Sequence, residues 1–523
     1  MTAVLSDRSL ARLRWLCVLA FLGIFAYYIT DTLHWPMIWD TPVMHYIHFL
    51  ITRGLRPYSD ITDMNLPGCY ITEGWGMAVF GWSDLSWRVY EFFLLAVLTI
   101  SGMVLGGRRN WFAGIFAASF FLVMHGSEGP RVATERDELM AILLIAAAAL
   151  FLVAVRKRAP AWMLPFGFLA ALATSLKPGA VLMEFGLLIL LFLYLRRDHQ
   201  RIGPFLLWIL LGNLIIVAVV LQFLLSNHAI GPLLFSVHTI LSSYSKLAQP
   251  GSMYMVRHLL PAALVPLIAA GFVAMAQRKN RPGSFLDLDR AVLFLGMAVG
   301  AFSYFMQGKG LTYHRYMAVL FVLLWIGYEL SAAMHREHAR SRWTAVTGIA
   351  LLYLLAAPYY VHLMRRSAAL GGEDSDPLAF TLQHDLTQLG GDQLQHQVLC
   401  LDMINGCFGA LYRMRLVQNT GATGDMLLFT PTPDFATNYY RNWFMARDRE
   451  HPANVVVVEN EWFQKQSPDF DKLNAWPQYA SYLSGHYDLV TERHFGPGDS
   501  PAYRIYLRKG SAVLASEQAN PLP

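Results

Sequence analysis

Long apolar runs recur along most of this chain, and they constrain its fold more than any other feature. Eleven such segments precede residue 365, and short charged clusters separate them. They cover residues 15–29, 89–105, 111–124, 139–155, 162–174, 180–195, 205–225, 259–275, 291–306, 317–330 and 343–361. A helix needs about 20 mostly apolar residues to cross a bilayer, so the shorter segments must extend into their flanks. We therefore predict a mainly α, polytopic membrane protein with about eleven transmembrane helices.

Clusters of Lys and Arg indicate how these segments are oriented in the membrane, because the clusters fall in every second loop. The basic positions are Arg8, Arg12 and Arg14 before the first segment, then Arg108-Arg109, 156–158, Arg196-Arg197, Arg278-Lys279, and Arg336 with Arg340 and Arg342. Cytoplasmic loops carry the excess of positive charge, which places the N-terminus in the cytoplasm and the protein in the inner membrane. No small-residue cleavage site follows the first segment, which we interpret as a span. The segments beside Lys177-Pro178 are either two short spans or one re-entrant element.

An odd number of spans leaves residues 366–523 outside the cytoplasm, where the composition becomes polar. Strand-like runs ("HQVLCLDM", "NVVVVENEW", "YRIYLRK") alternate there with a helix-like run ("PQYASYLSGHY"), which predicts a small periplasmic α/β domain. Cys400 and Cys407 could pair if the compartment is oxidising, or stay buried as free thiols. The chain is thus predicted to divide into a transmembrane domain, 1–365, and an extracytoplasmic domain, 366–523.

Five basic residues lie on the outside of this topology, at the mouths of spans, where membrane insertion does not explain them. They are Arg131, Arg136, Lys177, Lys309 and Arg315. Ionisable groups near membrane depth usually line a cavity or a substrate path, although each one alone could snorkel to the headgroups or pair with an acid. In "QGKGLTYHRY", residues 307–316, two of them stand with Tyr313 and His314 between two apolar runs. We interpret the set as a shared site for an anion such as a lipid-linked phosphate.

Acidic residues occur on the same side. Asp40 precedes "TPVMHYIHFLI", whose apolar residues are spaced for a helix lying along the membrane surface. Asp40 or Thr41, followed by Pro42, suits a helix start, and capping by Thr41 would leave the Asp40 carboxylate free to act as a general base. The other acids are Asp60 and Asp63 in a turn-like stretch, and Glu135, Asp137 and Glu138 at the start of the fourth segment. Turn formation and the helix dipole are alternative explanations for these five.

The first outside loop, residues 30–88, contains the stretch "RGLRPYSDITDMNLPGCYITEGWGMAVFGWSDLSWR". Its notable positions are Gly54, Pro57-Tyr58, Asp60, Pro67, Phe80-Gly81 and Arg88. With the acid that precedes it, this pattern resembles the first loop of the GT-C membrane glycosyltransferases, in particular the bacterial protein-mannosyltransferase-like and lipid A aminoarabinose transferase-like branches. "ATERDELMAILLIAAAAL", "ATSLKPGAVLMEFGLLILL" and "QGKGLTYHRYMAVLF" look similar to later landmarks of that family. The resemblance covers residues 1–365 and does not extend to the tail.

The resemblance implies a GT-C fold with a catalytic first outside loop and a cavity at the outer leaflet. Such enzymes take a sugar from a polyprenyl-phosphate donor and transfer it to an acceptor outside the cytoplasm. Asp40 matches the family's first-loop catalytic acid, but Thr41 follows it where relatives often have a second acid. This departure leaves open whether a divalent metal, held by Asp40 and Asp137 with help from other acids, is a cofactor.

These observations combine into one hypothesis. Asp40 removes the proton of an acceptor hydroxyl, which attacks the anomeric carbon of the sugar and inverts its configuration. The residues expected to bind the donor phosphate are Lys309, His314, Arg315, Arg136 and Lys177. Those expected to contact substrate or acceptor are Tyr58, Asp60, Asp63, Asp137 and Tyr313. The partners would be the lipid-linked donor, membrane lipid, and a glycan, lipid or protein acceptor; nucleic acid is not expected, because the net charge of +5 mostly reflects topology.

Two other classes of function compete with this hypothesis. A transporter or flippase of a phosphate-bearing lipid or glycan would also need a cationic cavity. It predicts functional charges deep within spans, or broken helices in two similar halves, and the sequence shows neither. A non-catalytic envelope scaffold would have its working part in the tail. Release of polyprenyl phosphate from labelled donors would separate an enzyme from a scaffold.

Overall fold

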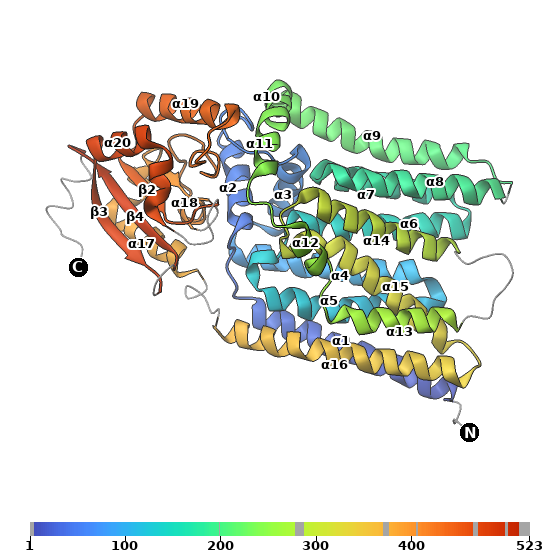
Figure 1. Ribbon diagram of the computed structural model, residues 1–523. Coiled ribbons are helices and arrows are strands. Elements are labelled where there is room, and N and C mark those ends of the chain that lie inside the picture. Colours follow the sequence, from blue (N-terminus) through green and yellow to red (C-terminus); the bar gives the residue numbers. More distant parts are fainter. Residues whose placement is uncertain are drawn as a thin grey trace.

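The computed structural model describes residues 5–197, 199–277, 287–369, 376–403, 406–463, 469–496 and 500–511. A bundle of long helices and a smaller sheet-containing domain are stacked end to end, and the N-terminus lies at the far end of the bundle from that domain (Figure 1). Arg278-Lys279, one of the basic clusters used for orientation, lies outside the described residues.

Each of the eleven apolar segments forms a helix of the bundle. They are α1 (Asp7–Thr32), α4 (Asp84–Asn110), α5 (Phe112–Glu128), α6 (Arg136–Lys157), α7 (Met163–Leu176), α8 (Val181–Arg197), α9 (Gly203–Ser226), α13 (Leu264–Ala276), α14 (Leu288–Gln307), α15 (Tyr316–Met334) and α16 (Ala339–Ala369). Within the described ranges, eight helices are long and apolar enough to cross a membrane, and three others, in α5, α7 and α13, are shorter and apolar. The chain is therefore a multi-pass membrane protein, and the number of crossings stays a prediction.

The uncertain segments beside Lys177-Pro178 are two separate helices. α7 ends at Leu176, and the 3-10 turn Pro178–Ala180 connects it to α8. A proline cannot donate to the hydrogen-bond ladder of the preceding turn, which explains the break. α7 packs closely on α9, where a Cβ added to Gly212 would lie 2.3 Å from the Leu164 carbonyl oxygen. Small residues at such contacts let transmembrane helices approach each other.

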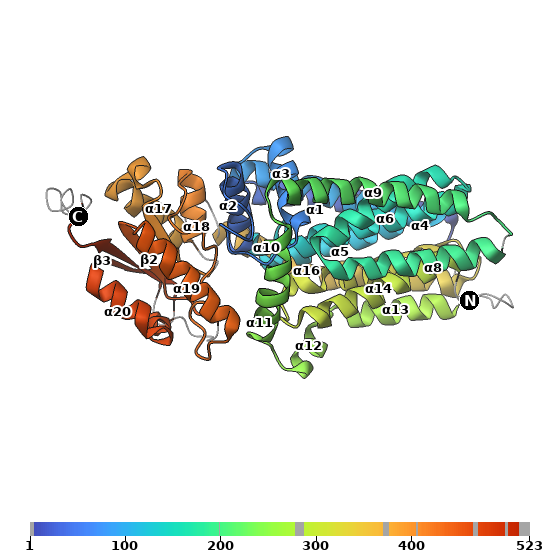
Figure 2. The same ribbon diagram turned by 90° about the horizontal axis from the view of Figure 1, so that it is seen from above.

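α2 (Asp40–Thr52) and α3 (Pro67–Phe80) lie at the end of the bundle next to the C-terminal domain (Figures 1 and 2). Trp39 precedes α2 in a left-handed conformation, φ 62°, and gives it no side-chain cap. The Thr41 hydroxyl donates to the Ala133 carbonyl oxygen, so the expected capping role of Thr41 is wrong. Residues 41–47 are all buried, because α2 packs between α3 and the C-terminal domain rather than along a lipid surface.

A third segment crosses the same end of the bundle. It consists of α10 (Ile230–Phe235), a π-helical turn (Ser236–Ile240), α11 (Leu241–Lys246) and α12 (Ser252–His258). The His238 side chain in this segment is exposed. Figure 2 shows α10 and α11 beside the boundary between the bundle and the C-terminal domain.

The C-terminal domain is built on a four-stranded mixed sheet with the strand order β1-β2-β4-β3. β1 (Val398–Leu401) and β2 (Val455–Glu459) are parallel, and β4 (Ala502–Arg508) pairs antiparallel with β2 and with β3 (Tyr487–His494). β1, β2, β4 and the helix α20 (Pro477–His486) correspond to the predicted runs. β3 was not singled out, because it is an edge strand in which Tyr487 alone is buried.

Two helices cover each face of this sheet (Figure 2). α17 (Pro377–Leu389) and α18 (Cys407–Met414) lie on one face, and α19 (Phe435–Glu450) and α20 lie on the other. Val455 and Val457 of β2 join the apolar core on the α17–α18 side, while Val456 and Val458 join the core on the α19–α20 side. A parallel strand buried on both faces has a continuous apolar run, which explains the "VVVV" sequence. The predicted α/β domain is confirmed.

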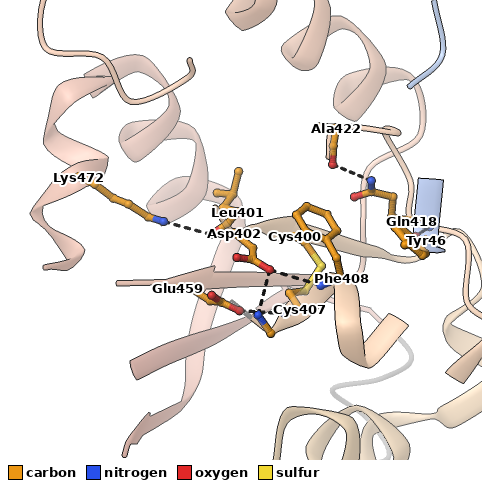
Figure 3. The surroundings of a disulfide bond; sticks show 11 residues. Tyr46, Cys400, Leu401, Asp402, Cys407, Phe408, Gln418, Ala422, Glu459 and Lys472 are labelled. Atoms are coloured by element: carbon orange, nitrogen blue, oxygen red, sulfur yellow. Dashed lines mark hydrogen bonds between the residues drawn. A yellow bond between two sulfur atoms is a disulfide. The ribbon is translucent and has the colours of Figure 1, made fainter. Parts of the chain in front are cut away.

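A disulfide links Cys400 of β1 to Cys407 at the start of α18 (Figure 3). Two carboxylates support the same helix start: Asp402 accepts from the Phe408 backbone N–H, and Glu459 accepts from the Cys407 backbone N–H at 2.8 Å. These groups satisfy backbone donors that the first turn of a helix leaves free. α18 is therefore fixed to the sheet by one covalent bond and by two acidic side chains.

The C-terminal domain also contacts the first outside loop. Arg447 of α19 donates to the Asp60 carboxylate at 2.9 Å. Thr62 and Ala422 form an isolated parallel β-bridge. The loop is therefore enclosed between the bundle and the domain.

The disulfide gives the first prediction. Cys17 and Cys69 are free thiols and are buried. After denaturation without reductant, we expect a maleimide to label these two cysteines, and to label all four of the chain after reduction. Mass spectrometry of the labelled protein provides the count. Cys400→Ser should expose one additional thiol, at Cys407; four labelled thiols in the unreduced wild type would contradict the disulfide.

Candidate active site

Side chains from the ends of several elements meet where the bundle faces the C-terminal domain. Asp40 is the first residue of α2, and Arg136 is the first residue of α6. Arg136 Nη2 lies 2.5 Å from Asp40 Oδ2, and the Tyr313 hydroxyl donates to the same oxygen at 3.3 Å. Asp40, Arg136 and Tyr313 therefore form one group that was assembled from three distant parts of the sequence.

A second ion pair lies beside the first. Lys177 Nζ is 2.5 Å from Asp137 Oδ2 and also donates to Gln307 Oε1. Gln307 Nε2 donates to the other Asp137 oxygen at 2.9 Å, and His314 Nε2 lies 3.8 Å from Asp137 Oδ2. His314 Nδ1 is buried and has no hydrogen-bond partner among the described residues. One ring nitrogen of His314 is therefore left without a partner in this part of the chain.

Residues of the first outside loop form a series of hydrogen bonds that begins at Arg136. Arg136 Nη1 donates to Asn65 Oδ1, and Asn65 Nδ2 donates to Asp63 at 2.8 Å. The Tyr70 hydroxyl donates to Asp63 Oδ2 at 2.6 Å, and the Tyr58 hydroxyl donates to the Asn65 carbonyl oxygen. Burial, followed by the nearby Asp63 charge, raises the pKa of Tyr58 well above its usual value. Tyr58 and Asp63 thus support the loop next to Arg136.

Lys309 binds to α11 instead of to an acid. Its Nζ donates to the carbonyl oxygens of Tyr244 and Leu247, and it lies 4.4 Å from the centre of the Tyr244 ring. Burial lowers the pKa of Lys309 to about 8. Burial and then the Asp40 charge raise the pKa of Tyr244 to about 12, so α11 covers the side of the site where Asp40 lies.

Arg315 points away from this group. Its Nη1 donates to the His258 carbonyl oxygen at 3.0 Å, and its Nη2 lies 3.7 Å from Glu128 Oε1. Arg131 donates to the same carboxylate group at 3.0 Å. The structure therefore does not gather Lys309, His314 and Arg315 into one cationic group: the basic side chains that meet the acids are Arg136 and Lys177.

Asp60 connects the loop to the C-terminal domain. It accepts from Arg56 Nε at 2.9 Å and from Arg447 Nη2 at 2.9 Å. Burial acts to raise the pKa of Asp60, but the hydrogen bonds from Arg56 and Arg447 outweigh it and hold this pKa well below the usual range. Both Asp60 oxygens are thus occupied by basic partners.

Glu135 differs from its acidic neighbours because its contact with a basic residue is long: Arg136 Nη2 lies 3.9 Å from Glu135 Oε2. Burial and then the Asp40 charge raise its pKa well above the usual 4.5. Its Oε1 is buried and has no hydrogen-bond partner within the described ranges. These surroundings favour the neutral form of Glu135, beside Asp137, whose carboxylate pairs with Lys177.

No protein-family model matches the chain, and no curated protein matches it. Solved structures do. ArnT from Cupriavidus metallidurans bound to undecaprenyl phosphate has a TM-score of 0.59 at 10% identity, over 93% of this chain and 97% of ArnT. The archaeal oligosaccharyltransferase AglB from Archaeoglobus fulgidus, in complex with an inhibitory peptide and a dolichol-phosphate, has a TM-score of 0.52 at 13% identity, over 95% of this chain and 77% of AglB.

Both of these proteins are GT-C glycosyltransferases. This chain has the GT-C fold. The similarity extends over the C-terminal domain, for which the sequence alone suggested no relative.

A small cavity lies between the first loop and the C-terminal domain. Its volume is about 50 Å³. The lining includes Thr62 and Asp63 of the loop, Ile240 before α11, and Tyr440 and Trp443 of α19. Because Asp63 bonds to Asn65, which in turn bonds to Arg136, the cavity is two hydrogen bonds from the Asp40 ion pair.

The sequence left open a divalent metal held by Asp40 and Asp137. In the structure each carboxylate is paired with a basic side chain, Arg136 or Lys177. A metal there would have to join or displace these groups. Within the described residues, the group of metal-type ligands is Glu91, His125 and Glu138, whose ligating atoms lie within 4.8 Å of one another.

This buried triad belongs to a closed network between α4, α5 and α6. Glu91 accepts from Arg88, from the Tyr28 hydroxyl at 2.7 Å and from His125 Nε2 at 2.8 Å. A metal ion could bind Glu91, His125 and Glu138 only after the His125–Glu91 hydrogen bond opened. In the sequence, this network is indicated by Glu91 and His125, which stand inside the apolar runs "YEFFLLAVL" and "FFLVMHG".

Four residues of the site were not singled out from the sequence: Asn65, Tyr70, Tyr244 and Gln307. All are uncharged, so the charge pattern gave no indication of them. Gln307 has the clearest position, because it is the last residue of α14 and immediately precedes the Gly-Lys-Gly stretch.

Glu135 and Asp137 provide a matched test of these charge assignments. Glu135→Gln should raise the thermal unfolding midpoint at pH 7 and should not lower it, because the amide resembles the neutral acid but takes up no proton on folding. Asp137→Asn should cost about 3 kcal/mol, because it leaves the Lys177 ammonium without its acid. The two midpoints can be measured on detergent-purified protein at pH 7.

The pH dependence has a definite sign. Because the folded-state pKa of Glu135 is raised, its contribution to stability is complete below pH 4.5 and is lost as the pH rises through the folded-state value. Glu135→Gln should remove this part of the loss of stability with rising pH. Equal destabilisation by both substitutions would contradict the assignment.

Proposed function

We propose that the protein is a glycosyltransferase that moves a sugar from a polyprenyl-phosphate donor to an acceptor at the outer face of the cytoplasmic membrane. The observation that carries the proposal is the Asp40–Arg136 ion pair, placed with Asp137 and Lys177 at one end of a membrane-spanning bundle. The fold similarity to ArnT bound to undecaprenyl phosphate, and to AglB bound to a dolichol-phosphate, supports a lipid-phosphate donor.

Asp40 is the proposed general base. Arg136 and Tyr313 hold one of its oxygens in place, and the carboxylate remains partly accessible, with 18% of the side chain exposed. An acceptor hydroxyl would lose its proton to Asp40 while its oxygen forms a bond to the anomeric carbon of the sugar. The bond from that carbon to the phosphate oxygen breaks in the same step, and the configuration inverts.

The departing polyprenyl phosphate gains negative charge, and basic groups that are already oriented can stabilise it. Arg136 offers a forked donor and Lys177 offers a point charge. Donor binding would have to uncover His314 Nδ1, which is buried and has no partner among the described residues. Lys309 lies within electrostatic range of His314 and adds positive charge from the α11 side. In this version of the hypothesis Arg136 and Lys177 are the principal phosphate ligands, and Arg315 has no direct part.

The C-terminal domain is proposed to lie outside the cytoplasm. The basic clusters orient the bundle this way. A buried disulfide between Cys400 and Cys407 is also typical of an oxidising compartment. The acceptor, whether a glycan, a lipid or a protein, would then approach from the side of the C-terminal domain, where the cavity beside Asp63 lies.

Transport of a phosphate-bearing lipid was the competing function. It requires charges that act along a path through the spans. Several buried charges within the described helices form closed pairs, such as Arg290 with Glu329 and Arg88 with Glu91. Pairs of this kind favour a structural role, and enzymatic transfer remains the proposal.

Asp40→Asn tests the proposed base. We expect the rate of sugar transfer to fall by about 10²- to 10⁴-fold, the usual contribution of a general base. Donor binding should persist, because Arg136 and Lys177 are unchanged. Transfer can be measured as release of polyprenyl phosphate from labelled donors by the purified protein, with Asp392→Asn, on the surface of the C-terminal domain, as the matched control. Turnover by Asp40→Asn at the wild-type rate would refute the assignment.

Lys309 predicts a pH effect on donor binding. Its pKa is about 8, so most of its positive charge is lost as the pH rises from 7 to 9. We expect the KM for the donor to increase by about 5- to 10-fold over this range, in line with the loss of most of the charged form. Lys309→Arg stays charged and should show a flat KM. If KM rises equally in the wild type and in Lys309→Arg, a group other than Lys309 is responsible for the pH effect.

A further inference from the structure

The C-terminal domain exposes few large apolar side chains, and most of them lie at one edge. Among its described residues, three large hydrophobic side chains are exposed: Phe435 (70%), Tyr439 (41%) and Leu489 (48%). Phe435 and Tyr439 are on the first two turns of α19, whereas Leu489 is on the edge strand β3. A phenylalanine this exposed beside a second aromatic ring indicates a contact surface.

The start of α19 touches the segment that crosses the end of the bundle. The rings of Phe235 and Tyr439 lie 4.7 Å apart, and the Ser243 hydroxyl donates to Asp434, which precedes α19. This segment has its own row of exposed apolar side chains: Ile230, Leu234, Val237 and Leu241. We call these four residues, with Phe435 and Tyr439, the apolar edge.

The apolar edge continues the lipid-facing surface of α9. Leu221 and Leu225, near the end of α9, are about half exposed, as expected for side chains that face acyl chains. The chain then turns through residues 227–229 directly into α10. Lys246 and Arg257 in the same segment are also exposed. Basic side chains beside apolar ones are typical of segments that lie at anionic headgroups.

We propose that the apolar edge lies in the headgroup layer of the membrane, so that the C-terminal domain docks on the phospholipid surface through Phe435 and Tyr439. The partner is lipid because the edge is continuous with the membrane-facing side of α9. α19 also carries Tyr440 and Trp443, which line the cavity beside Asp63. Docking of α19 would therefore hold that cavity at headgroup level. The inference does not depend on the proposed reaction.

Spin-label accessibility tests this surface on the full chain. Phe435→Cys and Leu489→Cys would each carry a nitroxide, in nanodiscs of phosphatidylethanolamine and phosphatidylglycerol. Oxygen concentrates in the bilayer, whereas a nickel chelate stays in water. We expect the oxygen-to-nickel collision ratio to be several-fold higher at position 435 than at position 489. Leu221→Cys on α9 gives the value for acyl chains, and unmodified protein gives the background from Cys17 and Cys69.

Leu234→Cys on α10 extends the test to a second element, in case a label at position 435 perturbs α19. It should resemble position 435. Equal ratios at positions 435 and 489 would overturn the proposal. So would low collision rates with both reagents at position 435, because protein, either a second copy or a partner, would then cover the edge. Neither result depends on whether sugar transfer is observed.

Discussion

Arg136 and Asp137 are neighbours at the start of α6 with opposite charges, and each forms an ion pair with a different part of the chain. Arg136 pairs with Asp40 of α2, and Asp137 pairs with Lys177 at the end of α7. A charge buried near membrane depth costs several kcal/mol unless it is paired. Asp137 is buried and the other three charges are partly buried, which is possible only when α2, α6 and the end of α7 meet. The same condition builds the proposed active site, so folding of this end of the bundle and assembly of the site are one event.

The C-terminal domain takes part in that assembly because it packs on the helix that begins with Asp40. α18 lies against α2, and the Gln418 backbone N–H donates to the Tyr46 hydroxyl at 2.9 Å. The Cys400–Cys407 disulfide fixes α18 to the sheet, and thereby fixes the surface that supports α2. The position of the proposed base thus depends on a domain far away in the sequence, which explains why α2 is buried instead of lying on lipid.

The periodic features of the sequence were reliable guides to the fold, and ion-pair partners were not. Apolar runs of helical length must be buried or face lipid, so each of the eleven became a helix. Lys309 and Arg315 are close in sequence but bind in different directions. The turn Thr312–Arg315 is a 3-10 helix, in which successive side chains point about 120° apart, so Tyr313 and Arg315 face different surroundings. Which acid each base meets is decided by tertiary packing, and no spacing in the sequence encodes it.

The first turn of α6 also connects the site to the buried network around Glu91. The Glu138 carboxylate accepts from the Thr134 backbone N–H, and the Trp87 indole N–H donates to the Thr134 hydroxyl. Thr134 has φ 57°, a left-handed conformation that such bonds can hold in place. The network is neutral when Arg88 balances Glu91 and one proton is held by His125 or Glu138. A neutral, closed network can stay buried while it fixes the turn that leads into Glu135 and Arg136. Glu138 and His125 therefore belong to the network that holds the start of α6, where Arg136 pairs with Asp40.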